Sequence, residues 1–258
     1  MNLIQTTQDQ NVLIITLNRP EKYNSFVRPM ALGLIDAINN AASNDEVRCI
    51  VITGTGKAFC AGQDLGEVMD ENGPGLERIV KEHYNQIIKA IRGVEKPVIA
   101  LVNGVAAGAG ANIAIACDLC IAKESASFIQ AFSKIGLIPD SGGTWFLPRL
   151  IGMQRATALA MLGTKVMAKE AEEMGMIYKS FPDEVAEEET LKVAHILSNM
   201  PTQALGYTKR AFNQGASNSL DEQLELEGKL QTASGQSHDY QEGVSAFLEK
   251  RPAKFTGK

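Results

Sequence analysis

Strand-like and helix-like segments alternate through the first half of the chain, and this alternation is what most constrains the fold. Three short runs rich in β-branched residues, at 12–17, 49–53 and 97–102, are bounded by polar or turn residues and predict strands. Between them, apolar side chains recur at intervals of three and four from Ile79 to Ile91, as on one face of a helix. Strands separated by helices need crossover connections, so the sequence predicts an α/β fold with a parallel sheet.

The composition shifts toward helix formers after about Gln154. Helices are predicted over 168–174, 184–199, 202–215, 220–232 and 240–249, with glycine or proline at the breaks between them. This region is too helical to extend the sheet much. We therefore expect a core over residues 1–195 and a helical C-terminal region over 196–258 that serves oligomerisation.

The charge balance excludes several classes of partner. The 258 residues include 25 lysines and arginines against 30 acids, a net charge of −5, so the chain lacks the basic surplus of a nucleic-acid-binding protein. Its N-terminus enters a strand-like pattern without the features of a signal peptide, and no uninterrupted apolar span is long enough to cross a membrane. We expect a cytoplasmic enzyme without nucleic-acid or membrane partners.

The cysteines and histidines are not spaced as metal ligands. Cys117 and Cys120 form a Cys-x-x-Cys pair, but neither a second pair nor a histidine stands at the matching distance. The segment 116–122 is more simply predicted as a buried strand, in which these thiols behave as small apolar groups. His83 falls on the apolar helical stripe and is expected to be packed in the core. No metal or redox cofactor is expected.

Two glycine-rich segments, at 54–65 and 103–112, each follow a predicted strand. Neither has the spacing of a phosphate-binding loop or of a dinucleotide fingerprint. Their small side chains leave backbone N–H groups free to point at a ligand oxygen, and two such donors on one carbonyl would form an oxyanion hole. Tight packing of the backbone explains the glycines equally well, so the spacing alone leaves both interpretations open.

The segment 135–144 sets a single carboxylate, Asp140, between Pro139 and a pair of glycines, just before a predicted helix at 144–150. An acid here can cap the helix, because free N–H groups and the helix dipole favour an ionised carboxylate. Gly142 and Gly143 also let the backbone pass close to a ligand. A cap and a catalytic acid are both consistent with this pattern.

Four motifs occur in an order that resembles the enoyl-CoA hydratase/isomerase family, also called the crotonase family. They are F-C-A-G-x-D-L at 59–65, N-G-x-A-x-G-x-G at 103–110, A-C-D-L at 116–119 and G-L-I-P-x-x-G-G-T at 136–144. The resemblance implies a crotonase fold, a spiral of repeated β-β-α units with a C-terminal helical trimerisation region. It also implies acyl-CoA thioester substrates, trimers or dimers of trimers, and no cofactor, since coenzyme A is part of the substrate.

The resemblance assigns the oxyanion hole to the backbone N–H groups of Gln63 and Ala109. It implies further substrate contacts from residues near this hole and near the acid: Ala61, Asp64, Gly110, Phe132 and Trp145. The phosphates of coenzyme A need cations, and the candidates lie near the first helix and at the C-terminus: Lys22, Lys250, Arg251 and Lys254. Solvated surface cations are an equally good interpretation of these four residues.

The departures from the family pattern concern the reaction. Hydratases of the family use two glutamates, and the corresponding positions here are Asn112 and Phe132. Neither side chain can act as a general base. Asp140 stands where several isomerases of the family carry their single acid. An apolar wall of Phe128, Phe132 and Trp145 would raise its basicity and accept a ring.

The segments 131–140 and 242–248 are similar to the subgroup of the family that converts 1,2-epoxyphenylacetyl-CoA to oxepin-CoA. The expected activity is therefore that of an acyl-CoA isomerase, which opens a ring epoxide or converts a 3-enoyl-CoA to a 2-enoyl-CoA. Asp140 would shuttle the proton while Gln63 and Ala109 stabilise the enolate.

Three other functions are known or conceivable for a fold of this kind. An enoyl-CoA hydratase is disfavoured by Asn112 and Phe132. An aromatic acyl-CoA dehalogenase is associated with tryptophan at position 132 and histidine at the position of Asn85. A non-catalytic acyl-CoA-binding or RNA-binding member of the fold is disfavoured by the intact glycine-rich loops, by Asp140 and by the absence of a basic surplus.

Overall fold

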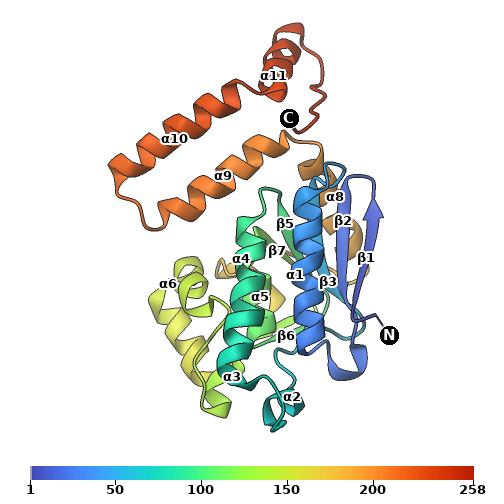
Figure 1. The fold of residues 1–258 in the computed structure, drawn as a ribbon, viewed down its shortest axis with the longest axis vertical. Coiled ribbons are helices and arrows are strands. Elements are labelled where there is room, and N and C mark those ends of the chain that lie inside the picture. The colour runs from blue at the N-terminus through green and yellow to red at the C-terminus, as the bar shows by residue number, and fades with distance from the viewer. Residues whose placement is uncertain (1) are drawn as a thin grey trace.

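The computed structural model describes residues 2–258 and arranges the strands in two sheets (Figure 1). In the larger sheet the first two strands are antiparallel and the other neighbours are parallel. Its order is β1 (Ile4–Asp9), β2 (Val12–Leu17), β3 (Cys49–Gly54), β5 (Val98–Val102), β7 (Leu119–Lys123) and β10 (Lys179–Phe181). The predicted strands at 12–17, 49–53 and 97–102 are confirmed as β2, β3 and β5.

The smaller sheet consists of three-residue strands. Its order is β4 (Ala58–Cys60), β6 (Val105–Ala107), β8 (Ser127–Ile129) and β9 (Lys165–Met167). In the chain β4 follows β3, β6 follows β5 and β8 follows β7, and each pair is succeeded by a helical segment. These are α2 (Leu65–Met69), α5 (Ala109–Ala116) and the 3-10 turn η3 (Ala131–Ile135). This repeated strand-strand-helix unit matches the expected spiral.

Helices cover both faces of the larger sheet. On one face lie α1 (Arg28–Ser43), α5 and a continuous helical segment made of α3 (Gly75–Arg78), the π-helical η2 (Ile79–Tyr84) and α4 (Asn85–Gly93). Every residue of α5 is buried, and His83 is completely buried, as its place on the apolar stripe predicted. On the opposite face α8 (Ala186–Ser198) packs against β3 and β7. The large core therefore lies under the loops that carry the candidate site.

Two local predictions change in the structure. The buried strand predicted at 116–122 is wrong in its first part, because α5 continues to Ala116 and Cys117 forms its C-terminal cap, so β7 begins only at Leu119. Small apolar residues suit a buried helix as well as a strand, which is why the pattern misplaced this boundary. The helix predicted at 144–150 is longer, since α6 extends over Gly143–Leu162 with a non-helical break at Gly152.

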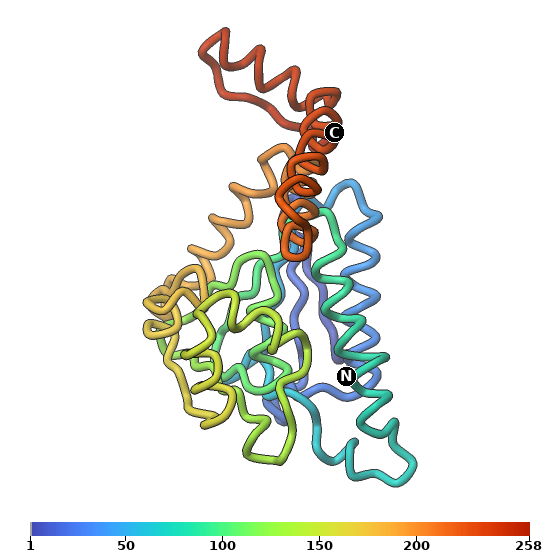
Figure 2. Tube along the Cα trace, turned by 90° about the vertical axis from the view of Figure 1, so that its left-hand side faces the viewer, coloured from blue at the N-terminus to red at the C-terminus, as the bar shows by residue number. Residues whose placement is uncertain are grey.

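The last three helices extend away from the body of the molecule (Figures 1 and 2). They are α9 (Thr202–Gly215), α10 (Leu220–Gly235) and α11 (His238–Glu249); together with α7 (Ala168–Glu173) and α8 they confirm the helices predicted from the composition. A cleft of about 960 Å³ with mostly apolar side chains lies among α9, α10 and α11. The proposed division at residues 195 and 196 falls inside α8 and stays a prediction. Among the described residues, no helix is long and apolar enough to span a bilayer.

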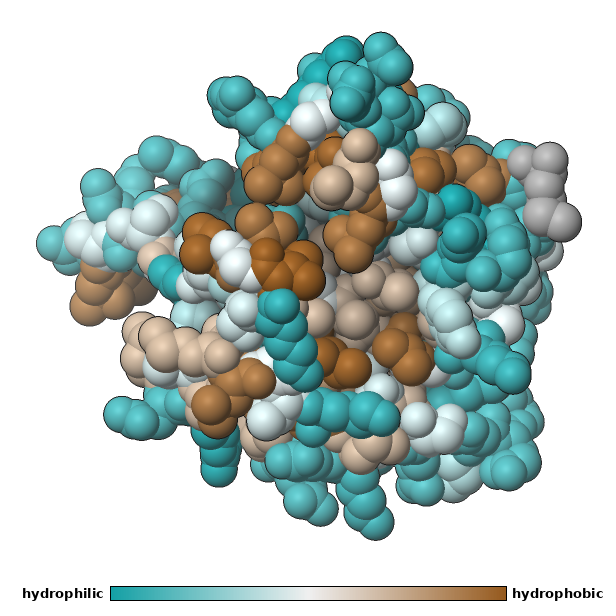
Figure 3. Space-filling view, turned by 90° about the horizontal axis from the view of Figure 1, so that it is seen from below, coloured by the Kyte–Doolittle hydropathy of each residue, from teal (hydrophilic) through white to brown (hydrophobic). Residues whose placement is uncertain are grey.

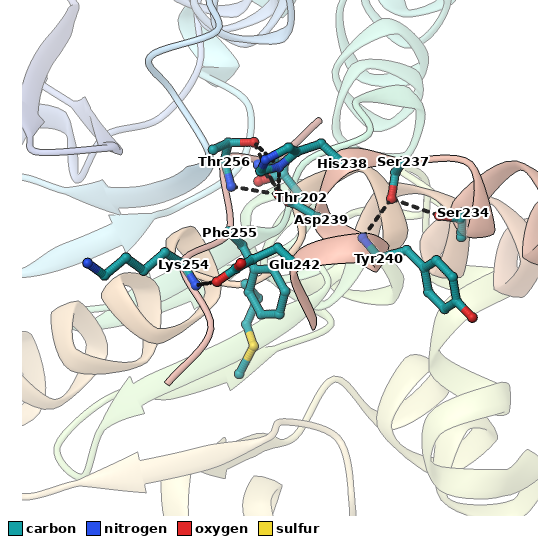
Figure 4. Close-up of polar contacts among 12 residues, drawn as sticks. Thr202, Ser234, Ser237, His238, Asp239, Tyr240, Glu242, Lys254, Phe255 and Thr256 are labelled. Atoms are coloured by element: carbon teal, nitrogen blue, oxygen red, sulfur yellow. Dashed lines mark hydrogen bonds and ion pairs between the residues drawn. The ribbon is translucent and has the colours of Figure 1, made fainter. Parts of the chain in front are cut away.

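The C-terminal segment folds back along α11 (Figure 4). The buried carboxylate of Asp239 accepts hydrogen bonds from the backbone N–H groups of Thr256 and Gly257, both at 2.7 Å. Glu242 accepts a hydrogen bond from the backbone N–H of Lys254 at 2.7 Å. Arg48, next to β3, donates to the carbonyl oxygen of Phe255 at 2.9 Å. The chain end thus ties the three helices to the sheet.

Candidate active site

Asp140 lies in the loop between η3 and α6, and its side chain does not cap the helix. The N-cap position is Gly142, with φ of 73°, and no side chain bonds to the first turn. The backbone carbonyl of Asp140 accepts from the N–H of Gly143 at 2.8 Å, so a backbone turn closes this helix end. The prediction of a helix cap is therefore wrong, because the left-handed turn at Ser141 and Gly142 separates the carboxylate from the helix N-terminus.

The environment of Asp140 favours its protonated form relative to water. Burial raises the pKa of its carboxyl group, and the only opposing side-chain hydrogen bond comes from the Ser141 hydroxyl at 2.8 Å. A raised pKa makes the ionised carboxylate a stronger base. A raised pKa fits a group that removes a proton from carbon, and the catalytic role of Asp140 stays a prediction.

Two backbone N–H groups of the glycine-rich loops remain free among the described residues. Ala109 is the first residue of α5, where a helix N–H has no partner within the helix. Gln63 pairs with Phe26 in a parallel bridge that uses the carbonyl of Gly62 and the N–H of Asp64. Within residues 2–258, neither the Gln63 N–H nor the Ala109 N–H finds an acceptor. Both groups are therefore available to a ligand oxygen.

The two loops approach each other through Gly62. A Cβ atom on Gly62 would lie 3.1 Å from the carbonyl oxygen of Ala107 and 3.6 Å from the nitrogen of Ala109. Its φ of 91° also favours glycine. Gly110 has a packing role, since a Cβ there would lie 2.2 Å from the carbonyl oxygen of Cys60. Tight packing of the backbone is therefore confirmed at both glycines, while the oxyanion hole and the contact of Gly110 with substrate stay predictions.

Asp64 and Ala61 are occupied by contacts within the protein. One oxygen of Asp64 accepts from Arg19 at 2.6 Å and the other caps α2 through the N–H of Gly66 at 2.7 Å. The Arg19 hydrogen bond holds the pKa of Asp64 below its usual value. The N–H of Ala61 donates to the carbonyl of Tyr23 at 3.0 Å. The arrangement fits a role for Asp64 in shaping the Gln63 loop, and its direct contact with substrate stays a prediction.

The three aromatic residues of the expected wall have different surroundings. The ring of Phe132 is buried, and a Cβ on Gly108 would lie 3.7 Å from it, which places Phe132 against the glycine-rich loop at 103–112. Phe128 is buried in the main core. Trp145 is 40% exposed and has the Arg149 guanidinium 4.1 Å from its ring centroid. A contact of Trp145 with substrate therefore stays a prediction.

Sequence reasoning missed a half-buried hydrogen-bond chain behind the glycine-rich loop at 54–65. The hydroxyl of Tyr84 donates to the Gln63 side-chain oxygen at 2.8 Å, and the Gln63 side-chain nitrogen donates to Glu67 at 2.8 Å. Burial, followed by the charges of Cys60 and Asp140, raises the pKa of Tyr84 well above its usual value, so its hydroxyl stays protonated. The apolar stripe indicated only that Tyr84 is buried. Its partner lies 21 residues away and leaves no local signal.

Of the two residues at the glutamate positions of hydratases, Asn112 contacts the Asp140 loop. Asn112 is fully buried, and its side-chain nitrogen donates to the carbonyl oxygen of Asp140 at 2.8 Å. The backbone N–H of Leu137, in the loop after η3, donates to the carbonyl of Phe132 at 3.0 Å. Neither residue offers a carboxylate here.

Apolar side chains border the entrance to this region. Seen from the end that carries α2 and α3, the surface has a hollow with apolar side chains around it (Figure 3). Exposed apolar residues occur on α2 and in the loop before α6: Leu65, Met69, Ile135, Leu137 and Ile138. A hollow of this kind suits an apolar acyl chain or ring.

The candidate cations for the CoA phosphates lie at opposite ends of the chain. Lys22 ends the 3-10 turn η1 (Pro20–Lys22) and precedes Tyr23. The carbonyl of Tyr23 accepts a hydrogen bond from the N–H of Ala61 in the glycine-rich loop at 54–65. Lys250 caps α11, far from α2 and α5 in Figure 1. Arg251 pairs with Glu242 and Glu249, and the amine of Lys254 extends away from the cluster in Figure 4. One chain therefore does not bring Lys22 and Lys250 together.

The cysteines lie inside the protein. Burial raises the pKa of Cys49, Cys60 and Cys117 to about 12, so each is a thiol at neutral pH. Across residues 2–258, no group of three or more histidine, cysteine or acidic side chains is arranged to hold a metal ion.

Comparison with known families identifies the family of this protein. Residues 7–258 match the family model described as enoyl-CoA hydratase/isomerase. The chain belongs to the enoyl-CoA hydratase/isomerase family. The resemblance inferred from the four motifs is therefore confirmed, and the protein is an enzyme of a family that acts on acyl-CoA thioesters.

Relatives within this family carry both isomerase and hydratase names. The chain is 46% identical to the 1,2-epoxyphenylacetyl-CoA isomerase of Escherichia coli K12 over the full length of both proteins. It is 48% identical to a probable enoyl-CoA hydratase of Rhodobacter capsulatus, with 96% of each chain covered. It is 39% identical to a trans-2-decenoyl-acyl-carrier-protein isomerase of Streptococcus mutans, with 97% of this chain and 96% of the relative covered.

Solved structures confirm the crotonase fold. A crystal structure of an enoyl-CoA hydratase from Bacillus anthracis superposes with a TM-score of 0.92 at 32% identity, covering 99% of this chain and 100% of the other. A structure from Geobacillus kaustophilus titled as an enoyl-CoA hydratase subunit gives a TM-score of 0.90 at 36% identity, covering 99% and 98%. The predicted α/β spiral is therefore the observed fold.

Proposed function

We propose that this member of the enoyl-CoA hydratase/isomerase family is an acyl-CoA isomerase that uses Asp140 as its single acid–base group. One observation carries the proposal. The half-buried Asp140 has a raised pKa and its backbone carbonyl is held by Asn112, while Asn112 and Phe132 occupy the two positions where hydratases of the family have glutamates. Two of the relatives above are named isomerases, which supports the same assignment.

The mechanism begins with the thioester carbonyl between the N–H groups of Gln63 and Ala109. Asp140 removes a proton from C2 of a 3-enoyl-CoA, and the electron pair moves onto the carbonyl oxygen to give a dienolate. The N–H donors stabilise that oxygen, a contribution of about 3 kcal/mol per donor in comparable sites. Protonated Asp140 then returns the proton to C4, which leaves the double bond between C2 and C3. Atoms and electrons balance without a cofactor.

The same site can serve a ring epoxide. Opening of 1,2-epoxyphenylacetyl-CoA to oxepin-CoA is also an isomerisation, and it can use a stabilised thioester enolate in the same way. Phe132, packed against the glycine-rich loop at 103–112, offers an apolar surface for the ring. The proposed substrates are therefore a ring epoxide, a linear 3-enoyl-CoA, or both.

Hydration is the second candidate, and the 48% identity to a probable enoyl-CoA hydratase favours keeping it. Water addition usually needs one group to orient the water and another to move its proton. Asp140 supplies only one of these. We therefore expect slow hydration at best.

Product analysis tests the proposal. The purified enzyme is incubated separately with 1,2-epoxyphenylacetyl-CoA and with a 3-enoyl-CoA, and the products are separated and identified by mass and absorbance. Formation of oxepin-CoA or of a conjugated 2-enoyl-CoA supports isomerisation. A 3-hydroxyacyl-CoA as the main product from both incubations would contradict it.

The quaternary structure and the remaining partners belong to the same proposal. We infer a trimer or a dimer of trimers in the cytoplasm, without nucleic-acid or membrane partners and without a cofactor. Large apolar side chains on the last three helices are exposed in the single chain, among them Phe212 at 73% and Phe247 at 83%. A neighbouring subunit would cover them, and Lys250 would reach CoA only from such a neighbour. Light scattering of the purified protein tests the oligomer.

A further inference from the structure

We propose that Asn112 is a positioning residue for the isomerisation: its side-chain amide fixes the Asp140 loop to α5, the helix that also carries the oxyanion donor Ala109. This inference rests on the proposed function. It gives a role to Asn112, which stands where hydratases of the family have a catalytic glutamate and which cannot act as a general base.

Both ends of the Asn112 amide are bonded inside the protein. Its nitrogen donates to the backbone carbonyl of Asp140 at 2.8 Å, and its oxygen accepts from the side-chain nitrogen of Gln130 at 2.8 Å. The side chain is 0% exposed. A buried amide with both ends bonded is held in one orientation, since breaking either bond leaves a buried polar group without a partner.

The loop can reach this amide only because position 143 is a glycine. A Cβ atom on Gly143 would lie 2.2 Å from the side-chain nitrogen of Asn112 and 2.6 Å from its amide carbon. The carbonyl of Asp140 also accepts from the N–H of Gly143 at 2.8 Å. Two donors, one from α5 and one from the start of α6, therefore hold the backbone of the catalytic residue.

Asn112 and Ala109 belong to the same turn of one helix. Residues three apart on a helix lie on one face, so the anchor of the acid and the oxyanion donor are rigidly spaced. The distance between the base and the thioester carbonyl is thereby set by α5 and is independent of the exposed loop at 133–138. Misplacement of a reacting group by about 1 Å can cost about 100-fold in rate.

The chemistry of the amide also bears on the choice of reaction. A carboxylate at position 112 has no donor for the carbonyl of Asp140 and would add a negative charge next to the acid. The amide supplies that donor without charge. Because both of its ends are occupied, Asn112 is not available to orient a water molecule. Its position thus favours proton transfer over hydration.

Steady-state kinetics of Asn112→Asp and Asn112→Ala with a 3-enoyl-CoA test the inference. Both variants should lower kcat by about 100-fold with little change in KM, because the acid is displaced. Asn112→Asp should also shift the acid limb of the pH profile of kcat to higher pH, since the new charge opposes ionisation of Asp140. Asn112→Ala adds no charge and should leave the limb in place. Asn39→Asp makes the same change on the exposed face of α1 and should alter neither quantity.

Hydrogen exchange separates this inference from the proposed function. In Asn112→Ala the amides of residues 140–146 should exchange faster than in the wild type, while those of β3 and β5 stay protected. If Asn112→Asp does not fold, Asn112→Ala alone decides. Variants that keep wild-type kcat and unchanged exchange at 140–146 in an active isomerase overturn the inference alone. A folded wild type that isomerises neither substrate overturns the proposed function, and the inference with it.

Discussion

At the scale of single residues, the proposed role of Asp140 rests on what its neighbours do. The left-handed backbone at Ser141 and Gly142 closes the start of α6, so the carboxylate is not used as a helix cap. Gln63 and Ala109 have free N–H groups because one sits in a bridge and the other begins a helix. The site is thus assembled from backbone geometry as much as from side chains.

Asp140→Asn should reduce isomerisation by about 100- to 10,000-fold, the range associated with the loss of a general acid–base group. The same variant should melt at a higher temperature at pH 7. Burial raises the pKa of the folded carboxyl, so ionised Asp140 destabilises the fold at every pH above that pKa, and an amide removes this cost. Calorimetry and an isomerase assay on one preparation check both effects. Wild-type activity in the variant would remove Asp140 from the mechanism.

The activity of the wild type should fall on the acid side as Asp140 becomes protonated. Because burial raises its pKa above the ordinary value of 3.8, the acid limb of kcat/KM should lie above that value. A pH series with a 3-enoyl-CoA measures the limb. The limb should be absent from the residual activity of Asp140→Asn, and its persistence there would assign it to another group.

Tyr84→Phe should lower kcat by about fivefold, which corresponds to one hydrogen bond of about 1 kcal/mol. The hydroxyl of Tyr84 holds the Gln63 side chain, and its loss loosens the loop that presents the Gln63 N–H. Tyr178→Phe is the matched control, since Tyr178 is 59% exposed. Equal kcat in the two variants would show that this hydrogen bond does not position the oxyanion donor.

At the scale of elements, long patterns were predictable and short ones were not. The strands β2, β3 and β5 and the helices after residue 168 follow from β-branched runs and from helix formers between breaks. The three-residue strands β4, β6 and β8 are too short to show an alternation, although they place the glycine-rich loops. The contact between Asn112 and Asp140 joins residues 28 positions apart, and no local pattern encodes it.

The buried cysteines at the end of β4 and at the junction of α5 and β7 give a prediction. Burial raises the pKa of Cys60 and Cys117 to about 12, so neither is a thiolate in the folded protein. Iodoacetamide at pH 8 should modify them only after unfolding in denaturant, which peptide mass mapping can measure. Rapid modification of Cys60 in the native protein would show that the end of β4 opens, and rapid modification of Cys117 would show that the junction of α5 and β7 opens.

At the scale of the whole molecule, the C-terminal segment ties the arm of α9, α10 and α11 to the body. Asp239 binds the backbone of Thr256 and Gly257, while Arg48 binds Phe255 and the side chain of Thr202. These contacts hold the arm together with the pairs that link α9 to the body, such as Lys209 with Asp118 at 2.7 Å. An oligomer built through this arm would depend on them as well.

Asp239→Asn should destabilise the protein by about 2 kcal/mol, because hydrogen bonds to a charged acceptor are replaced by weaker ones. Burial alone raises the pKa of Asp239, but the N–H groups of Thr256 and Gly257 outweigh it and the pKa is lowered. This contribution is therefore present at neutral pH and lost as the pH falls through the lowered pKa. Thermal melts at pH 7, with exposed Asp36→Asn as the control, measure the difference. Equal melting temperatures would contradict the role of Asp239.

The central claim is that this site isomerises and does not hydrate. The most direct measurement compares two rates on one enzyme preparation: appearance of conjugated-thioester absorbance from a 3-enoyl-CoA, and its disappearance from the matching 2-enoyl-CoA. A single acid at Asp140 predicts a fast first rate and a second rate at least about 100-fold slower, the lower range of what a missing acid–base group costs. Rapid loss of the 2-enoyl absorbance, with a slow first rate, would contradict the account.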